Sequence, residues 1–194
     1  MRHFAFRPTL TTKGRAFKGL RGYAGKPFHP PLTDVPVTAY LFAAAFDVLS
    51  IAVKGSHPVV GRQLFVAGTW VMLGGAAVSL LAALTGWADW SRSSEPGTQA
   101  RRTINAHAIT MISVTVLVLV DLALRTLHYQ DRLAAPGIIV VLSVIAAAGV
   151  SLGATYGGTL VYDYGFNVET AGDSPVWHKS EVDAFPGDHG EASS

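Results

Sequence analysis

Cysteine is absent from this sequence, and charged residues are scarce. The 194 residues include no Cys, and Asp, Glu, Lys and Arg together make up 14% of the chain. Without thiols the chain can form no disulfide framework, iron–sulfur cluster, thiolate zinc site or cysteine nucleophile. Soluble domains average about 25% charged residues, so this chain has too few ionic groups to cover a water-soluble globule. Its 49% of hydrophobic residues also excludes a disordered chain.

Familiar catalytic and nucleic-acid motifs are absent as well. The sequence has no Walker loop, GxSxG elbow, HExxH helix or Rossmann fingerprint. We therefore expect no catalytic activity of the chain on its own. Its basic residues are not accompanied by a recognition motif, so nucleic acid is not an expected partner.

Charge is missing from four long runs rather than thinned evenly. The second and fourth runs contain no charged residue, the first contains only Asp47 and the third only Asp121. Each run has about the 20 residues with which a helix crosses roughly 30 Å of hydrocarbon. Short loops favour up-down-up-down order. The sequence therefore predicts an all-α transmembrane four-helix bundle within residues 29–166, with helices near residues 35–53, 64–86, 104–124 and 137–156.

Small residues recur every four positions in two of these runs. Gly149, Gly153 and Gly157 form one series, and Gly75, Ser79 and Ala83 form the other. Small side chains allow helix backbones to approach closely inside lipid. Both series therefore predict faces on which helices pack.

Basic residues are distributed unevenly between the two sides of the predicted bundle. Four crossings place both termini and the connection after the second helix on one side, which holds 11 Lys and Arg residues. The other side holds only Lys54, Arg62, Arg125 and Arg132. The positive-inside rule therefore predicts cytoplasmic termini and a multi-pass protein of the bacterial cytoplasmic (inner) membrane.

The two ends of the chain carry opposite charge. Residues 1–28 contain seven basic residues and no acid, and we expect this basic cytoplasmic arm to lie along anionic lipid headgroups. Residues 167–194 contain six acidic residues and Lys179, which is typical of a flexible acidic tail.

Three ionisable residues lie near the far end of the predicted membrane helices. Asp121 and Arg125 are four residues apart on one face of the third helix, and Asp47 is expected at similar depth on the first. Each such group costs at least about 2.5 kcal/mol in hydrocarbon, so each requires a partner. We interpret Asp47, Asp121 and Arg125 as a structural ion pair, with a proton relay through the two carboxylates as the alternative.

A second set of polar residues is expected at the end of the bundle where the first helix begins. His29 and Asp34 precede the first run, Asp89 follows the second, and His107 opens the third. His107 is the best candidate haem ligand, with His29 as its candidate partner, although His29 precedes two prolines and is expected before the regular helix. A metal site of His29, Asp34, Asp89 and His107 is a second interpretation, and a hydrogen-bond network that anchors helix ends is a third.

Several separated motifs resemble one bacterial membrane-protein family, domain of unknown function 2231. They are HPPLTDVPVTAYLFAAAFD (29–47), TGWADW (85–90), NAHA (105–108) and GGTLVYDYGFNV (157–168). The resemblance implies a four-helix inner-membrane module distantly similar to cytochrome b-type haem bundles. It places the family's histidine-proline start on His29 and its third-helix histidine on His107. Some relatives have a second histidine after the first, and that place is Asp34 here.

These observations lead to one expected function and two alternatives. We expect a cofactor-binding or accessory subunit, with haem b as the candidate cofactor, in the lipid bilayer beside other membrane subunits of a respiratory or electron-transfer complex. The alternatives are a small proton-conducting channel or transporter that uses Asp47 and Asp121, and a purely structural membrane protein.

Overall fold

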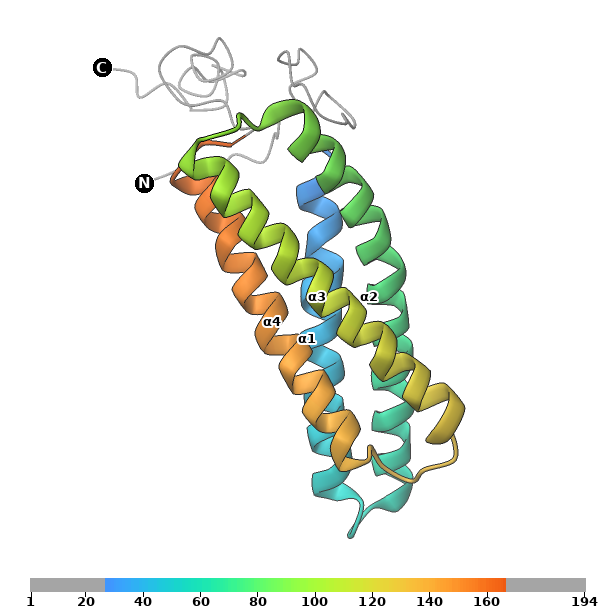
Figure 1. The fold of residues 1–194 in the computed structure, drawn as a ribbon. Helices are drawn as coiled ribbons and strands as arrows, with labels where there is room; N and C mark the ends of the chain where they lie inside the picture. Colours follow the sequence, from blue (N-terminus) through green and yellow to red (C-terminus); the bar gives the residue numbers. More distant parts are fainter. Residues whose placement is uncertain (1–26, 167–194) are drawn as a thin grey trace, which may run out of the picture.

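The structure is a computed structural model, and it describes residues 27–166. These residues form four helices joined by short connections, and the helices run up-down-up-down through one bundle (Figure 1). The predicted all-α four-helix architecture is confirmed. The acidic tail lies outside the described residues, as does the basic arm apart from residues 27 and 28. The helices are α1 His29–Val53, α2 Pro58–Ser93, α3 Gln99–His128 and α4 Gly137–Tyr162.

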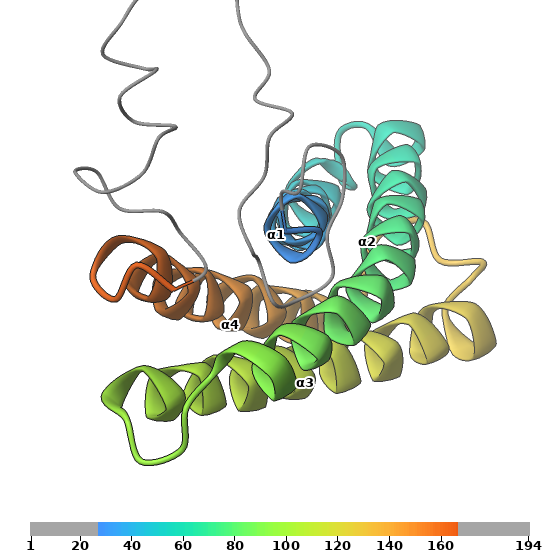
Figure 2. The same cartoon turned by 90° about the horizontal axis from the view of Figure 1, so that it is seen from above.

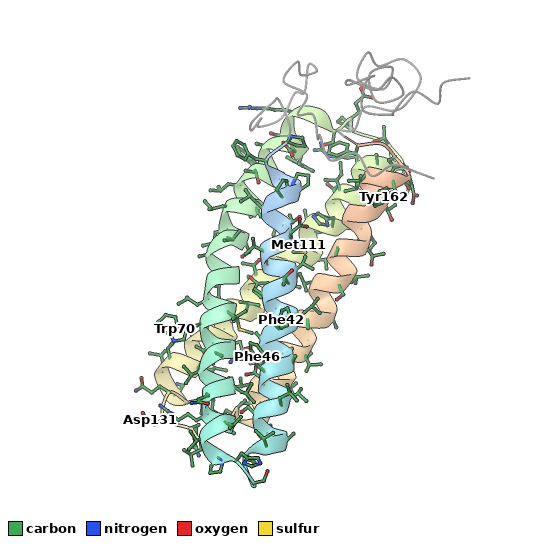
Figure 3. The ribbon with its side chains drawn as sticks, turned by 180° about the vertical axis from the view of Figure 1, so that it is seen from behind. Phe42, Phe46, Trp70, Met111, Asp131 and Tyr162 are labelled. Carbon is green, nitrogen blue, oxygen red and sulfur yellow. The ribbon has the colours of Figure 1, made fainter. Side chains whose placement is uncertain are left out.

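All four helices are long and apolar enough to cross a membrane. Their outer faces carry large apolar side chains, such as Phe42, Leu81 and Ile109, of which 53%, 53% and 66% are exposed. Such a surface favours aggregation in water, whereas lipid chains cover it in a bilayer. Trp70 projects from the outer face of α2, and Tyr162 lies at the end of α4 (Figure 3). The bundle is therefore built for contact with lipid.

The helices extend beyond the predicted apolar runs at most of their ends. Hydropathy marks the part of a helix inside hydrocarbon, whereas backbone hydrogen bonding continues into the headgroup region. The expectation that His29 precedes the regular helix is wrong, because His29 is the first residue of α1. Pro30 and Pro31 fit the first helical turn, where the N–H that proline lacks would have no intrahelical partner.

Each helix packs against two neighbours. α1 lies beside α2 and α4, and α3 lies beside the same two helices on the opposite side of the bundle. Figure 2 shows the four helices from above, with α1 seen nearly end-on between α2 and α4. We call the end with the start of α1, the connection 94–98 and the end of α4 the α2–α3 end. The end with the connections 54–57 and 129–136 is the α3–α4 end.

Small residues allow the helices to pack closely. A Cβ atom added to Gly149 would lie 2.6 Å from Val114 Cγ2, and one added to Gly75 would lie 2.6 Å from Ala39 Cβ. The predicted packing face of α4 is therefore present. On α2 the prediction is wrong for Ala83, which is exposed, because an exact four-residue step drifts around a helix of 3.6 residues per turn. Ala82 is buried in its place.

Arg101 fixes the start of α3 to the end of α2. Its guanidinium carbon lies 3.8 Å from the centre of the Trp90 ring, and its Nη1 donates to the carbonyls of Trp90 and Ser94 at 3.1 Å each. These are terminal carbonyls of α2, which lack intrahelical partners. Trp90 Nε1 in turn donates to Asn105 Oδ1 at 2.8 Å. This bond joins the end of α2 to α3 near His107, which lies two residues after Asn105.

Candidate ligand site at the paired histidines

His29 is held against α2 by its own ring nitrogen. Its Nδ1 lies 2.9 Å from the carbonyl oxygen of Ala82. A carbonyl oxygen only accepts hydrogen bonds, so Nδ1 carries the proton and donates. The second ring nitrogen, Nε2, of the neutral imidazole then keeps its lone pair.

His107 is held against α4 in the same way. Its Nδ1 lies 2.8 Å from the carbonyl oxygen of Gly153 and donates to it. Metal-ligating histidines typically donate one ring N–H to a carbonyl or carboxylate, which fixes the tautomer and the ring orientation. Both histidines therefore have the supporting bond that ligation through Nε2 requires.

The two imidazole rings come together across the bundle. Their centres are 6.2 Å apart and their planes are nearly perpendicular, at 86°. Two imidazoles that bind one ion from opposite sides, at about 2.0–2.1 Å each, have ring centres roughly 6 Å apart. The observed separation of His29 and His107 matches that requirement, although the rings come from the diagonal helices α1 and α3.

A glycine lies against each imidazole. A Cβ atom at Gly86 would lie 2.8 Å from His29 Cε1, and one at Gly157 would lie 3.6 Å from His107 Cε1. Gly86 is four residues after Ala82, and Gly157 is four residues after Gly153. In the α1–α2 pair and in the α3–α4 pair alike, the histidine ring therefore bonds to a backbone carbonyl of the second helix and lies against the glycine four residues after it. From the sequence, Gly157 was predictable only as a packing residue, and no pattern distinguished Gly86.

When residues are counted from His29 in α1 and from His107 in α3, the same numbered positions are buried in both helices. This common register puts the two inner faces at corresponding heights along the bundle axis. Any group on that axis therefore meets both hairpins in a similar way. The positions 7, 11, 14 and 18 residues after the histidine are Pro36, Tyr40, Ala43 and Asp47 in α1, and Val114, Val118, Asp121 and Arg125 in α3.

The four-residue metal site expected from the sequence is not assembled. Asp34 is exposed on α1, whereas Asp89 is buried near the end of α2. Within residues 27–166, no three side chains of His, Cys, Asp or Glu are grouped so that they could hold a metal ion. Of the predicted ligands, the structure brings together His29 and His107.

The three charged residues predicted to pair form one cluster near the α3–α4 end. Arg125 Nε donates to Asp121 Oδ1 at 3.0 Å, and Arg125 Nη1 donates to Asp47 Oδ1 at 3.0 Å. Arg125 Nη2 bonds to the second oxygen of Asp47 and, at 3.2 Å, to that of Asp121. Arg125 is 1% exposed and both carboxylates are fully buried.

All five N–H groups of the Arg125 guanidinium have partners, because Nη1 also donates to Thr69 Oγ1 at 3.3 Å. The Phe65 ring lies 5.3 Å from the guanidinium carbon. Residues of α1, α2 and α3 thus surround one cation. Buried charges are tolerated when they are paired and fully hydrogen-bonded, which is the arrangement seen here.

An apolar layer separates this ion cluster from the histidines. It consists of fully buried side chains contributed by all four helices, about one turn from the cluster on the histidine side. Apolar side chains cannot relay protons, so this layer leaves no continuous chain of polar groups along the bundle axis. The layer comprises Ala43, Met72, Val118 and Ala146.

These features define the class, an integral membrane protein of four helices that buries its ionisable side chains and presents apolar ones to lipid. The chain belongs to the family described as "Predicted membrane protein (DUF2231)", whose sequence profile matches residues 25–170. The match spans the whole bundle and confirms the family resemblance found in the sequence. No match was found among curated proteins or among solved structures.

Proposed function

We propose that this membrane protein binds one b-type haem through His29 and His107 and serves as a cofactor-binding subunit of an electron-transfer complex. The observation that carries the proposal is the pair of imidazoles with centres 6.2 Å apart, each anchored through Nδ1 to a backbone carbonyl. A hydrogen bond from Nδ1 to a carbonyl fixes the ring so that Nε2 can bind a metal.

The number of protein donors favours haem over a bare metal ion. Structural zinc takes four protein ligands and catalytic zinc takes three. Haem iron has four nitrogen ligands in the macrocycle and needs at most two axial ligands from the protein. The two histidines therefore fit haem, and bound haem would supply one-electron redox chemistry.

The residues around the histidines are also suited to a large flat group. Gly86 and Gly157 place backbone rather than side chain beside the rings. The Gly153 carbonyl accepts from His107, while Met111 packs on Gly153. α1 and α3, which carry the histidines, are not neighbours in the helix ring, and neither are α2 and α4. A planar cofactor between the two imidazoles would be enclosed by the small residues of α2 and α4.

The alternative of a proton channel through Asp47 and Asp121 receives less support. The apolar layer interrupts the axis, and all five donors of Arg125 are bonded within the protein. A proton path needs hydroxyl, carboxyl or water groups in sequence. The cluster is better suited to fastening helices.

We further propose that the α2–α3 end faces the cytoplasm of a bacterial inner membrane. Arg125 is buried in the ion cluster, so it does not contribute to the loop charge of the α3–α4 end. That end keeps only Lys54, Arg62 and Arg132, which strengthens the charge bias that the positive-inside rule uses. The basic arm would then meet anionic headgroups of the cytoplasmic leaflet.

An optical spectrum tests the proposal. The full-length protein purified in detergent should show reduced-minus-oxidised haem bands, and His29→Ala or His107→Ala should abolish or shift them. His57→Ala and His128→Ala are matched controls, because both residues are exposed at the α3–α4 end, and they should leave the bands unchanged. If a wild-type preparation is incubated with haem, freed of unbound haem and then shows no haem bands, the proposal is refuted.

A further inference from the structure

One buried polar atom in the bundle has no partner. Within residues 27–166, the hydroxyl of Tyr40 is the sole buried side-chain nitrogen or oxygen without a hydrogen bond. The side chain itself has no exposed surface. Leaving a buried hydroxyl unbonded is unfavourable, so the atom indicates a partner that the polypeptide does not supply.

The position of Tyr40 relates this hydroxyl to the histidine site. Tyr40 packs in the main core cluster with Val114 and Val150, which belong to α3 and α4. Its ring also lies on α2, because a Cβ atom at Gly75 would be 3.0 Å from Tyr40 Cε1. Side chains of a helix tilt toward its N-terminus, so Tyr40 is directed toward the α2–α3 end.

Ser79 marks the height of the hydroxyl. The Ser79 hydroxyl donates to Ala76 O at 2.8 Å and lies close enough to Tyr40 Oη to interact with it, but the two hydroxyls are not joined by a hydrogen bond of good geometry. Ser79 is three residues, or roughly 4.5 Å along the helix, before Ala82, whose carbonyl holds His29. The unbonded hydroxyl therefore lies about one helical turn below the Ala82 carbonyl that holds His29, inside the bundle beside α2.

We infer that Tyr40 is a third binding residue of the histidine site, and this inference rests on the proposed haem function. Its hydroxyl would donate a hydrogen bond to an oxygen atom that is present when haem is bound. That oxygen belongs either to a haem propionate or to a water molecule held beneath the ring. In both cases the haem-bound state provides the partner that the ligand-free protein lacks.

The test compares Tyr40→Phe with wild type in the full-length, detergent-solubilised protein. Haem b affinity should fall about threefold to tenfold if water accepts the bond, and more than about tenfold if a propionate carboxylate accepts it. The melting temperature of the ligand-free variant should be equal to or higher than that of wild type, because an unbonded hydroxyl has been removed. Tyr162→Phe is the matched control, because Tyr162 is 87% exposed and should change neither quantity.

Haem b dimethyl ester distinguishes the two acceptors. If a propionate carboxylate accepts the bond, the affinity difference between wild type and Tyr40→Phe should shrink with the esterified haem, because an ester carbonyl accepts a weaker bond than a carboxylate. If water accepts it, the difference between the two proteins should persist.

Three results would overturn the inference. Unchanged haem b affinity of Tyr40→Phe would remove Tyr40 from the site while leaving the haem proposal intact. A lower melting temperature of the ligand-free variant would show that the hydroxyl is bonded within the protein. Failure of wild type to bind haem b would refute both proposals together.

Discussion

Asp47 and Arg125 lie eighteen residues after His29 and His107, respectively, and they bond to each other across the bundle. The inner faces of α1 and α3 are thus linked twice, by opposite charges near the α3–α4 end and by two imidazoles near the α2–α3 end. The four predictions below follow from these two links and from the glycines beside them.

Removing the cation should destabilise the bundle strongly. Arg125→Leu would leave two buried carboxylates without a counter-charge, and breaking a buried pair in this way costs about 3–5 kcal/mol. Thermal unfolding in detergent would measure the loss. Arg132→Leu is the control, because Arg132 is exposed, and its effect should stay within about 0.5 kcal/mol. Equal stability of the two variants would contradict a structural role for the cluster.

The carboxylates of Asp47 and Asp121 should not contribute equally to the stability of the bundle. Asp47 joins α1 to α3 through two bonds, whereas Asp121 bonds to Arg125 within α3. Asp121→Asn leaves one carboxylate for one guanidinium and should cost about 1 kcal/mol, whereas Asp47→Asn should cost about 2–3 kcal/mol. Unfolding of both variants under the same conditions tests the order, and a larger loss for Asp121→Asn would reverse it.

Three glycine-to-alanine changes should differ according to what the new Cβ atom meets. Gly86→Ala places it 2.8 Å from His29 Cε1 and should displace the ring and weaken haem binding. At Gly157 the distance is 3.6 Å, and at Gly74 nothing lies within 4 Å. Gly157→Ala should therefore weaken haem binding less than Gly86→Ala, and Gly74→Ala should keep haem and gain up to about 1 kcal/mol from helix propensity. Haem absorbance and thermal unfolding together separate the cases, and normal haem binding by Gly86→Ala would argue against the site.

Gly149→Ala should be destabilising and rescuable. Its Cβ atom would lie 2.6 Å from Val114 Cγ2, and overpacking of this kind typically costs about 1–3 kcal/mol. Val114→Ala removes the clashing methyl groups, so the double variant should regain part of the stability lost in Gly149→Ala. A double-variant cycle measures this coupling. Simple additivity of the two losses would show that Gly149 and Val114 do not meet in the membrane.

The number and course of the helices were predictable because hydrocarbon demands long apolar runs. The Asp121–Arg125 contact was predictable as well, because residues four apart share a helix face. Side-chain patterns gave no sign of the carbonyls that hold the histidines, since Ala82 and Gly153 contribute only backbone oxygen.

Asp34 shows why the predicted metal site failed. The expectation assumed that His29 preceded the helix, which left the direction of Asp34 free. Once His29 begins α1, five residues at about 100° each turn Asp34 roughly 140° away from the histidine. The carboxylate therefore lies on the outer surface, where the structure shows it exposed.

The separation of Asp47 and Arg125 along the chain has a consequence for biosynthesis. Arg125 is made 78 residues after Asp47, and ribosomes add about 5–20 residues per second, so a delay of roughly 4–16 s separates them. During that interval the nascent α1 holds a carboxylic acid whose permanent counter-ion does not yet exist. The insertion machinery must therefore shelter α1, or admit it with Asp47 neutral, until the second hairpin arrives.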